Sequence, residues 1–121
     1  MIFEIGKMDR YISEKEYSIN SDRLDVVWRR VERSVPTYAF EVQIGGNPYQ
    51  VLAKLHHAYN IWNSNIYLIT ENEQRDKIDE ILGGSFYEIK NVVNVANLGQ
   101  VKDLYSAQLK DVALRHQIGL P

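Results

Sequence analysis

Hydrophobic and polar residues alternate in two stretches of the first half of the chain. The first stretch has Leu24, Val26 and Trp28 at alternate positions, and the second has Tyr38, Phe40 and Val42. Alternation with a period of two is typical of half-buried strands. We therefore predict two strands, with Leu24, Val26 and Trp28 on one face. The connection over residues 31–36 is short, polar and ends in proline, which suits a hairpin-type return.

From residue 48 onward the apolar residues recur at helical spacing. A helix is predicted from Pro48 with Asn47 as its N-cap, and its buried stripe contains Val51, Leu52, Leu55, Ala58, Tyr59 and Trp62. Two further helices are predicted over residues 71–82 and 98–117. Thr70 and Glu73 would form a capping box for the first, and the apolar side of the second would hold Val101, Leu104, Tyr105, Leu109 and Val112.

The remaining elements complete an alternating order of strands and helices. Residues 1–9 predict a short helix, residues 11–19 an edge strand, and the apolar runs 66–70 and 92–95 two buried strands. Strands that alternate with helices favour parallel pairing in the second half of the chain. The expected fold is therefore an α/β domain over residues 1–121, with a mixed β-sheet flanked by helices.

Composition narrows the chemistry. The 121 residues include no cysteine, which excludes disulfides and thiolate metal sites and favours a reducing, cytoplasmic location. No apolar run approaches the roughly 20 residues that span a bilayer, so no membrane partner is expected. The formal net charge of −2 argues against gripping nucleic acid by overall electrostatics. DNA binding would therefore require a local basic patch or a bound cation.

Asp25 and Glu41 are the first candidates for a functional site. If the return between the two strands centres near Arg33 and Ser34, antiparallel pairing places Asp25 within one residue of Glu41. Directly opposed side chains lie about 5 Å apart at Cβ. The simpler alternative is a pair of exposed carboxylates on the polar face of the sheet. Two opposed like charges without a cation are destabilising, however, so the pairing favours a metal site.

The segments RLDVVWR and YAFEVQ resemble the core motifs of the PD-(D/E)XK nuclease superfamily, over about residues 1–100. The likeness is to its restriction-endonuclease-like and archaeal Holliday-junction-resolvase-like domains. It implies a Mg²⁺-dependent DNA endonuclease, with Mn²⁺ as a substitute, that hydrolyses phosphodiester bonds with a metal-activated water. It also implies that the metal ligands are Asp25, Glu41 and the backbone carbonyl of Val42. An additional acid would be Glu4 or Glu16.

The chain departs from this family at the position of the motif lysine, where it has Gln43. An amide can orient a water but lends no positive charge to a transition state, and losing one such donor costs on the order of 10²- to 10³-fold in rate. Lys54, on the following helix, would return an ammonium to the site; the alternative is that it only lines the solvent edge. A second hypothesis therefore stays open, in which the domain has lost catalysis and serves as a DNA-binding or assembly module.

Basic residues gather near the predicted hairpin and suggest where DNA would approach. The candidates for nucleic-acid contact are Arg23, Arg29, Arg30, Arg33 and His57. The alternatives are a solvated hairpin for the arginines and an ordinary surface position for His57. A homodimer or a place in a larger complex is expected, because so small a domain covers little DNA alone.

Overall fold

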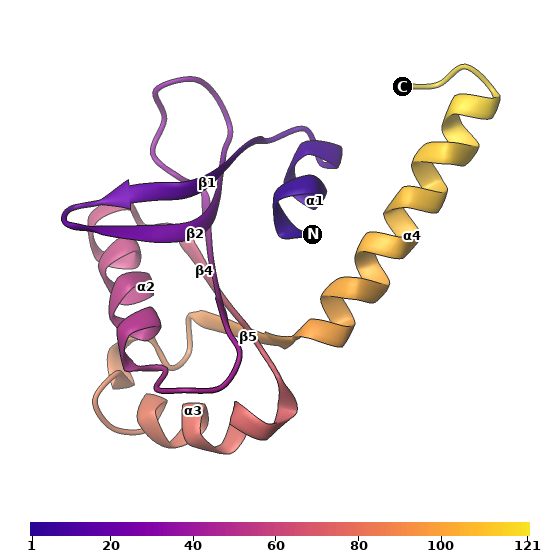
Figure 1. Ribbon diagram of the computed structural model, residues 1–121. Helices are drawn as coiled ribbons and strands as arrows, with labels where there is room; N and C mark the ends of the chain where they lie inside the picture. Colours follow the sequence, from indigo (N-terminus) through magenta and orange to yellow (C-terminus); the bar gives the residue numbers. More distant parts are fainter.

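The computed structural model describes residues 1–121 and has the predicted mixed α/β architecture (Figure 1). The helices are α1 (Ile2–Met8), α2 (Tyr49–Trp62), α3 (Arg75–Leu82) and α4 (Leu98–Gln117). The strands are β1 (Ile12–Ile19), β2 (Asp22–Arg29), β3 (Tyr38–Gln43), β4 (Asn65–Thr70) and β5 (Val93–Asn97). Short 3₁₀ helices, η1 (Asn72–Gln74) and η2 (Tyr87–Ile89), flank α3.

The five strands form one sheet whose spatial order follows the sequence, β1-β2-β3-β4-β5. β1, β2 and β3 pair antiparallel, and β4 and β5 add in parallel. Parallel strands need a crossover connection, which α2 provides between β3 and β4. The prediction of a mixed sheet flanked by helices is confirmed.

The two faces of the sheet are covered unequally. On one face a cluster that includes Leu24, Val27 and Ala39 packs against α2 and α3. On the other face a smaller cluster of Val26, Trp28, Phe40 and Ile69 contacts only α1 and the start of α4. Figure 1 shows α2 beside the sheet and α3 across the bottom of the view, whereas α4 runs away from the sheet toward the C-terminus. The first face therefore supplies most of the buried core.

The ends of the helices follow local hydrogen bonding. The predicted N-cap of α2 is wrong by one residue: Pro48 is the N-cap, and Asn47 before it accepts a hydrogen bond from the Tyr49 N–H through its Oδ1 at 3.0 Å. The predicted capping box of Thr70 and Glu73 is wrong. The Thr70 hydroxyl donates instead to the Gln43 carbonyl at 2.6 Å, which ties β4 to β3. The expected helix 71–82 consequently divides into η1 and α3.

Fewer apolar residues of α4 are buried than its sequence pattern predicts. Val101 is its one buried residue, while Leu104 and Leu109 are exposed. A capping box between Asn97 and Gln100 begins the helix firmly. None of the helices combines the length and apolarity that spanning a membrane requires.

We predict that Gly6→Ala destabilises the protein. A Cβ at position 6 would lie 2.3 Å from Nε1 of the Trp28 indole, which packs under α1 and donates a hydrogen bond to the Ile2 carbonyl. Overpacking of this kind costs about 1–3 kcal/mol. Urea denaturation measures the loss. The matched control is Gly84→Ala, where the nearest atom lies 3.7 Å from the new Cβ; equal effects from both variants would contradict the prediction.

Candidate functional site

The β2–β3 ladder ends where the candidate carboxylates stand. Its last pairs are Trp28 with Tyr38, Val27 with Ala39 and Val26 with Phe40, so Asp25 and Glu41 come next in this register. Here side chains replace backbone partners. The Asp25 N–H donates to Glu41 Oε2 at 2.7 Å, and the Val42 N–H donates to Asp25 Oδ2 at 2.8 Å. The predicted approach of the two acidic residues on adjacent antiparallel strands is confirmed.

A local irregularity in the neighbouring strand accompanies this break. β1 pairs with β2 on both sides of Glu16 but not at Glu16 itself, which has a φ of 51°. Beyond it, Leu24 packs in the cluster under α2 whereas Val26 packs in the opposite one. The prediction that Leu24, Val26 and Trp28 share a face is therefore wrong for Leu24. An interruption of this kind bends a strand and redirects its side chains, and here it frees Asp25 to turn toward β3.

Glu41 is fully buried, with 0% of its surface exposed, between the sheet and α2. Its neighbour Ala39, on the same side of β3, belongs to the cluster that packs against α2. The Lys54 ammonium forms an ion pair with Glu41 Oε1 and donates a hydrogen bond to the Arg23 carbonyl at 3.0 Å. The expected proximity of Lys54 to Glu41 is thus confirmed, whereas the alternative of a lysine at the solvent edge does not hold.

The electrostatics of this group are set by burial and by a shortage of positive charge. The pKa of Glu41 is raised to about 7, mainly by burial and also by the nearby Asp25 carboxyl, against the lowering influence of Lys54 and the Asp25 N–H. Burial lowers the pKa of Lys54, but the Glu41 ion pair and the charges of Asp25 and Asp22 outweigh it, so that this pKa is raised. Two carboxyl groups therefore share one ammonium, and the group favours an additional cation or a proton.

The residues that follow Glu41 point elsewhere. The Gln43 side-chain amide donates to the Gly45 carbonyl, so it stabilises the turn before α2 rather than facing the two acids. Val42 contributes its backbone N–H to Asp25, and its side chain is exposed. Gln43, at the expected lysine position, therefore stabilises the β3–α2 turn, and the positive charge near the two acids comes from Lys54 on α2.

The two candidates for an additional acid differ in position. Glu4 lies on α1, which packs with the Trp28 cluster on the other face of the sheet. Its carboxylate contacts the Met1 amino group at 3.4 Å, so the structure does not bring Glu4 to the pair. Glu16 lies on β1, opposite Asp25 and between the pairs Lys15–Val26 and Tyr17–Leu24, and is exposed. Of the two, only Glu16 stands beside the site.

The predicted basic patch is divided between the two ends of β2. Arg29 is buried and forms an ion pair with Glu14, which removes it from the candidates for DNA contact. Arg30 and Arg33 are exposed at that same end, beside the β2–β3 loop. Arg23 lies at the opposite end, two residues before Asp25, and is exposed. Only Arg23 therefore adjoins the carboxylates.

The structure adds a small cavity that sequence reasoning missed. It has a volume of about 270 Å³ and lies between the tip of the β1–β2 hairpin and α2. Lys54 and His57 line it from α2, and Asn20 and Asp22 line it from the hairpin. His57 Nε2 and Asn20 Nδ2 are 2.6 Å apart and join the two walls. The sequence signal for this hairpin tip was Asn20 and Ser21 between two predicted strands. Asparagine tolerates the left-handed conformation (φ 53°) that such turns require.

The residues fit a divalent cation in donor type and in charge. Both acids offer oxygen atoms, the ligands that Mg²⁺ prefers, and Mg²⁺ usually takes only one or two carboxylates together with waters and substrate phosphate. Glu41 Oε1 is buried and, apart from the Lys54 ion pair, has no hydrogen bond. No group of three or more histidine, aspartate or glutamate side chains is placed to hold a metal anywhere in the chain. A cation here would therefore depend on Asp25, Glu41 and oxygen atoms from water or substrate.

We predict that Glu41 makes the protein less stable as the pH rises from about 5 to 8. Because its folded pKa of about 7 lies above the unfolded value of 4.5, the folded state binds the proton more tightly, and this advantage disappears as the pH passes 7. Glu41→Gln removes the titration. The unfolding free energy of the variant should rise relative to wild type by up to about 1.4 kcal/mol per pH unit across this range. Denaturant titrations at several pH values measure this difference, and the opposite slope would mean that Lys54 keeps Glu41 ionised.

No protein-family model, curated protein sequence or solved structure matches this chain. What its site can do follows from the residues that form it: two carboxyl groups at the end of the β2–β3 ladder and one ammonium from α2.

Proposed function

We propose that this domain is a metal-dependent nuclease that hydrolyses phosphodiester bonds in DNA. The observation that carries the proposal is the convergence of Asp25, Glu41 and Lys54 from three separate elements at one point of the sheet. Two acids and a lysine supply cation ligands and a positive charge, which a phosphodiester hydrolase requires. The PD-(D/E)XK resemblance supports the same assignment, and the order of acid, antiparallel return, acid and helix agrees with it.

Each residue has a distinct role in this proposal. Asp25 and Glu41 would hold Mg²⁺ or Mn²⁺, which when bound neutralises phosphate charge and activates a water. Lys54 would stabilise the negative charge that develops on the phosphate. It would thereby replace the motif lysine, whose position is occupied by Gln43. Hydrogen bonds from the Asp25 and Val42 N–H groups to Glu41 and Asp25, respectively, keep both carboxylates in position before any ligand arrives. Exposed Arg23 and the cavity lined by His57 lie beside them, where the substrate backbone would pass.

A second candidate function is a DNA-binding or assembly module without catalysis. Gln43 favours it, because its amide is engaged with the Gly45 carbonyl. The ion pair between Lys54 and Glu41 also favours it, since it partly satisfies the buried carboxylate without a metal. Cation binding and cleavage must therefore be measured separately.

We predict cleavage of DNA in the presence of Mg²⁺ or Mn²⁺, and its loss in Asp25→Ala. A panel of labelled duplex, single-stranded, flap and junction DNAs, with matched RNAs, would show the preferred substrate. The two-carboxylate ligand set leaves little affinity when one member is removed, so at least a hundredfold loss is expected. Cleavage that persists in Asp25→Ala would come from another site or a contaminant.

A thermal-denaturation series with Mg²⁺, Mn²⁺ and Ca²⁺ separates the two candidate functions. Binding to the folded state raises the melting temperature. A shift in wild type that disappears in Asp25→Ala/Glu41→Ala, without cleavage, would favour the module. Equal shifts in both proteins would place the ions elsewhere and remove the metal site from either function.

We predict that Lys54→Ala reduces cleavage on the order of 10²-fold or more while metal affinity stays the same or rises slightly. The variant removes the transition-state charge but also a cation that competes for Glu41. Adding Gln43→Lys to Lys54→Ala should restore part of the rate. Single-turnover cleavage rates and metal titrations provide the two readouts. Full activity in Lys54→Ala would exclude a role for this lysine.

A further inference from the structure

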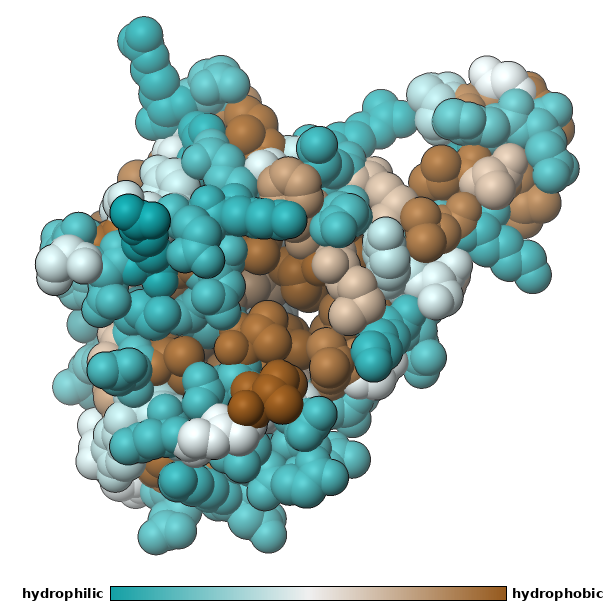
Figure 2. Space-filling view, viewed as in Figure 1, coloured by the Kyte–Doolittle hydropathy of each residue, from teal (hydrophilic) through white to brown (hydrophobic).

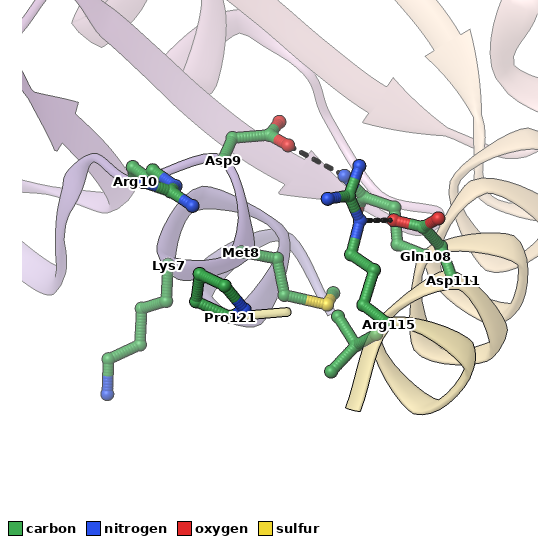
Figure 3. A pocket seen from close by; sticks show the side chains of 9 residues that line it. Lys7, Met8, Asp9, Arg10, Gln108, Asp111, Arg115 and Pro121 are labelled. Carbon is green, nitrogen blue, oxygen red and sulfur yellow. Dashed lines mark hydrogen bonds and ion pairs between the residues drawn. The ribbon is translucent and has the colours of Figure 1, made fainter. Parts of the chain in front are cut away.

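Helix α4 exposes more apolar surface than its contacts with the domain explain. Of its 20 residues only Val101 is buried, while Leu104, Leu109 and Leu114 are exposed. Most helices in proteins are stabilised by packing of an apolar face rather than by helix propensity alone. Figure 3 shows its distal half standing apart from α1, with a cavity of about 730 Å³ between them and a Gln108–Asp9 hydrogen bond near its edge. The exposed leucines of α4 therefore keep about half of their surface uncovered within the chain.

The side chains of α4 divide into two stripes. The stripe toward the domain contains Val101, Tyr105, Gln108 and Val112, all buried or half-buried. The outward stripe contains Leu104, Ala107, Asp111 and Leu114 and continues to Ile118, the residue after the helix; all are exposed, at alternating spacings of three and four residues. Asp111, at the edge of the cavity beside α1, forms an ion pair with Arg115. That spacing is typical of a helix that packs lengthwise against another helix. Asp103 and Lys110 lie on one edge of the outward stripe.

We propose that the outward stripe of α4 is the interface of a two-fold symmetric homodimer, in which the α4 helices of two copies pack antiparallel. The charges on its edge are complementary in this arrangement. When the helices cross beside Ala107, Asp103 of each copy lies opposite Lys110 of the other, so that one contact is made twice by symmetry. The small Ala107 side chain lets the helices approach closely at the crossing.

The stripe is also continuous with an open apolar groove. Leu104 lines this groove of about 350 Å³ together with Tyr11, Trp28, Tyr38 and Phe40 from the thinly covered face of the sheet. Figure 2 shows hydrophobic surface gathered in the hollow between the body of the domain and the projecting helix. In the antiparallel pair, the second half of one α4 lies beside the first half of the other, where Leu104 forms the mouth of the groove. The dimer therefore covers two exposed apolar surfaces at once, and it does not depend on the proposed nuclease activity.

Sedimentation equilibrium of the full chain over a wide concentration range tests the proposal. Wild type should approach twice the chain mass, and Leu114→Glu should shift the dissociation constant at least tenfold toward monomer. The matched control is Leu109→Glu, since Leu109 has nearly the same exposure (47% against 51%) but lies about 140° around the helix from Leu114. Circular dichroism confirms that both variants keep their helices.

Charge reversal tests the antiparallel register. Asp103→Lys places like charges together twice and should weaken the dimer several-fold, and adding Lys110→Asp should restore wild-type affinity. A wild type that stays monomeric at all concentrations would overturn the proposal, and the stripe would then belong to a different protein's interface. Equal dissociation by Leu109→Glu and Leu114→Glu, or failure of the double reversal to restore association, would also overturn it.

Discussion

The buried carboxylate of Glu41 is the constraint on which the rest of the site depends. An ionised carboxylate inside the apolar layer between the sheet and α2 is costly unless it is paired and hydrogen-bonded. The Asp25 N–H and the Lys54 ammonium supply those partners. To supply them, β2 must remain unpaired with β3 at Asp25, just before Val26, and α2 must place Lys54 beside Glu41. The burial of the Glu41 carboxylate thus links the irregularity of β2, the position of α2 and the electrostatics of the site.

This arrangement separates positioning from chemistry. The carboxylates of Asp25 and Glu41 are oriented by backbone N–H groups, which do not titrate and are held by β2 and β3. Burial raises the pKa of Glu41, and the remaining imbalance of two carboxyl groups against one ammonium adds to this and favours binding of a cation. A site that is rigid in geometry but short of positive charge is suited to exchange a proton for a metal ion. This property is common to an active nuclease and to a metal-binding module.

Helices cover the two faces of the sheet to different extents. The face under α2 and α3 is closed, and it is the face that carries Glu41. The face under α1 is covered by a seven-residue helix and the first turns of α4, and it leaves an aromatic groove open. The candidate site and the proposed dimer contact therefore lie on opposite sides of the sheet. A second copy can bind α4 without covering the carboxylates.

The sequence by itself determined the α/β class, nearly all helices and strands, and the approach of Asp25 to Glu41, because period-2 and helical patterns are local and the β2–β3 connection is short. It also determined that Lys54 lies near the edge of the packing face of α2. Only the tertiary structure decided that Leu24 turns to the opposite face from Val26, because this depends on the irregularity beside Glu16. Likewise, the ion pair with Glu14 takes Arg29 away from DNA contact, and the hydrogen bond to the Gly45 carbonyl turns Gln43 away from the two acids. Sequence periodicity does not predict either contact. The burial of a side chain and its hydrogen-bond partners depend on how the sheet and the helices pack together. Residues with similar sequence patterns can therefore differ in both.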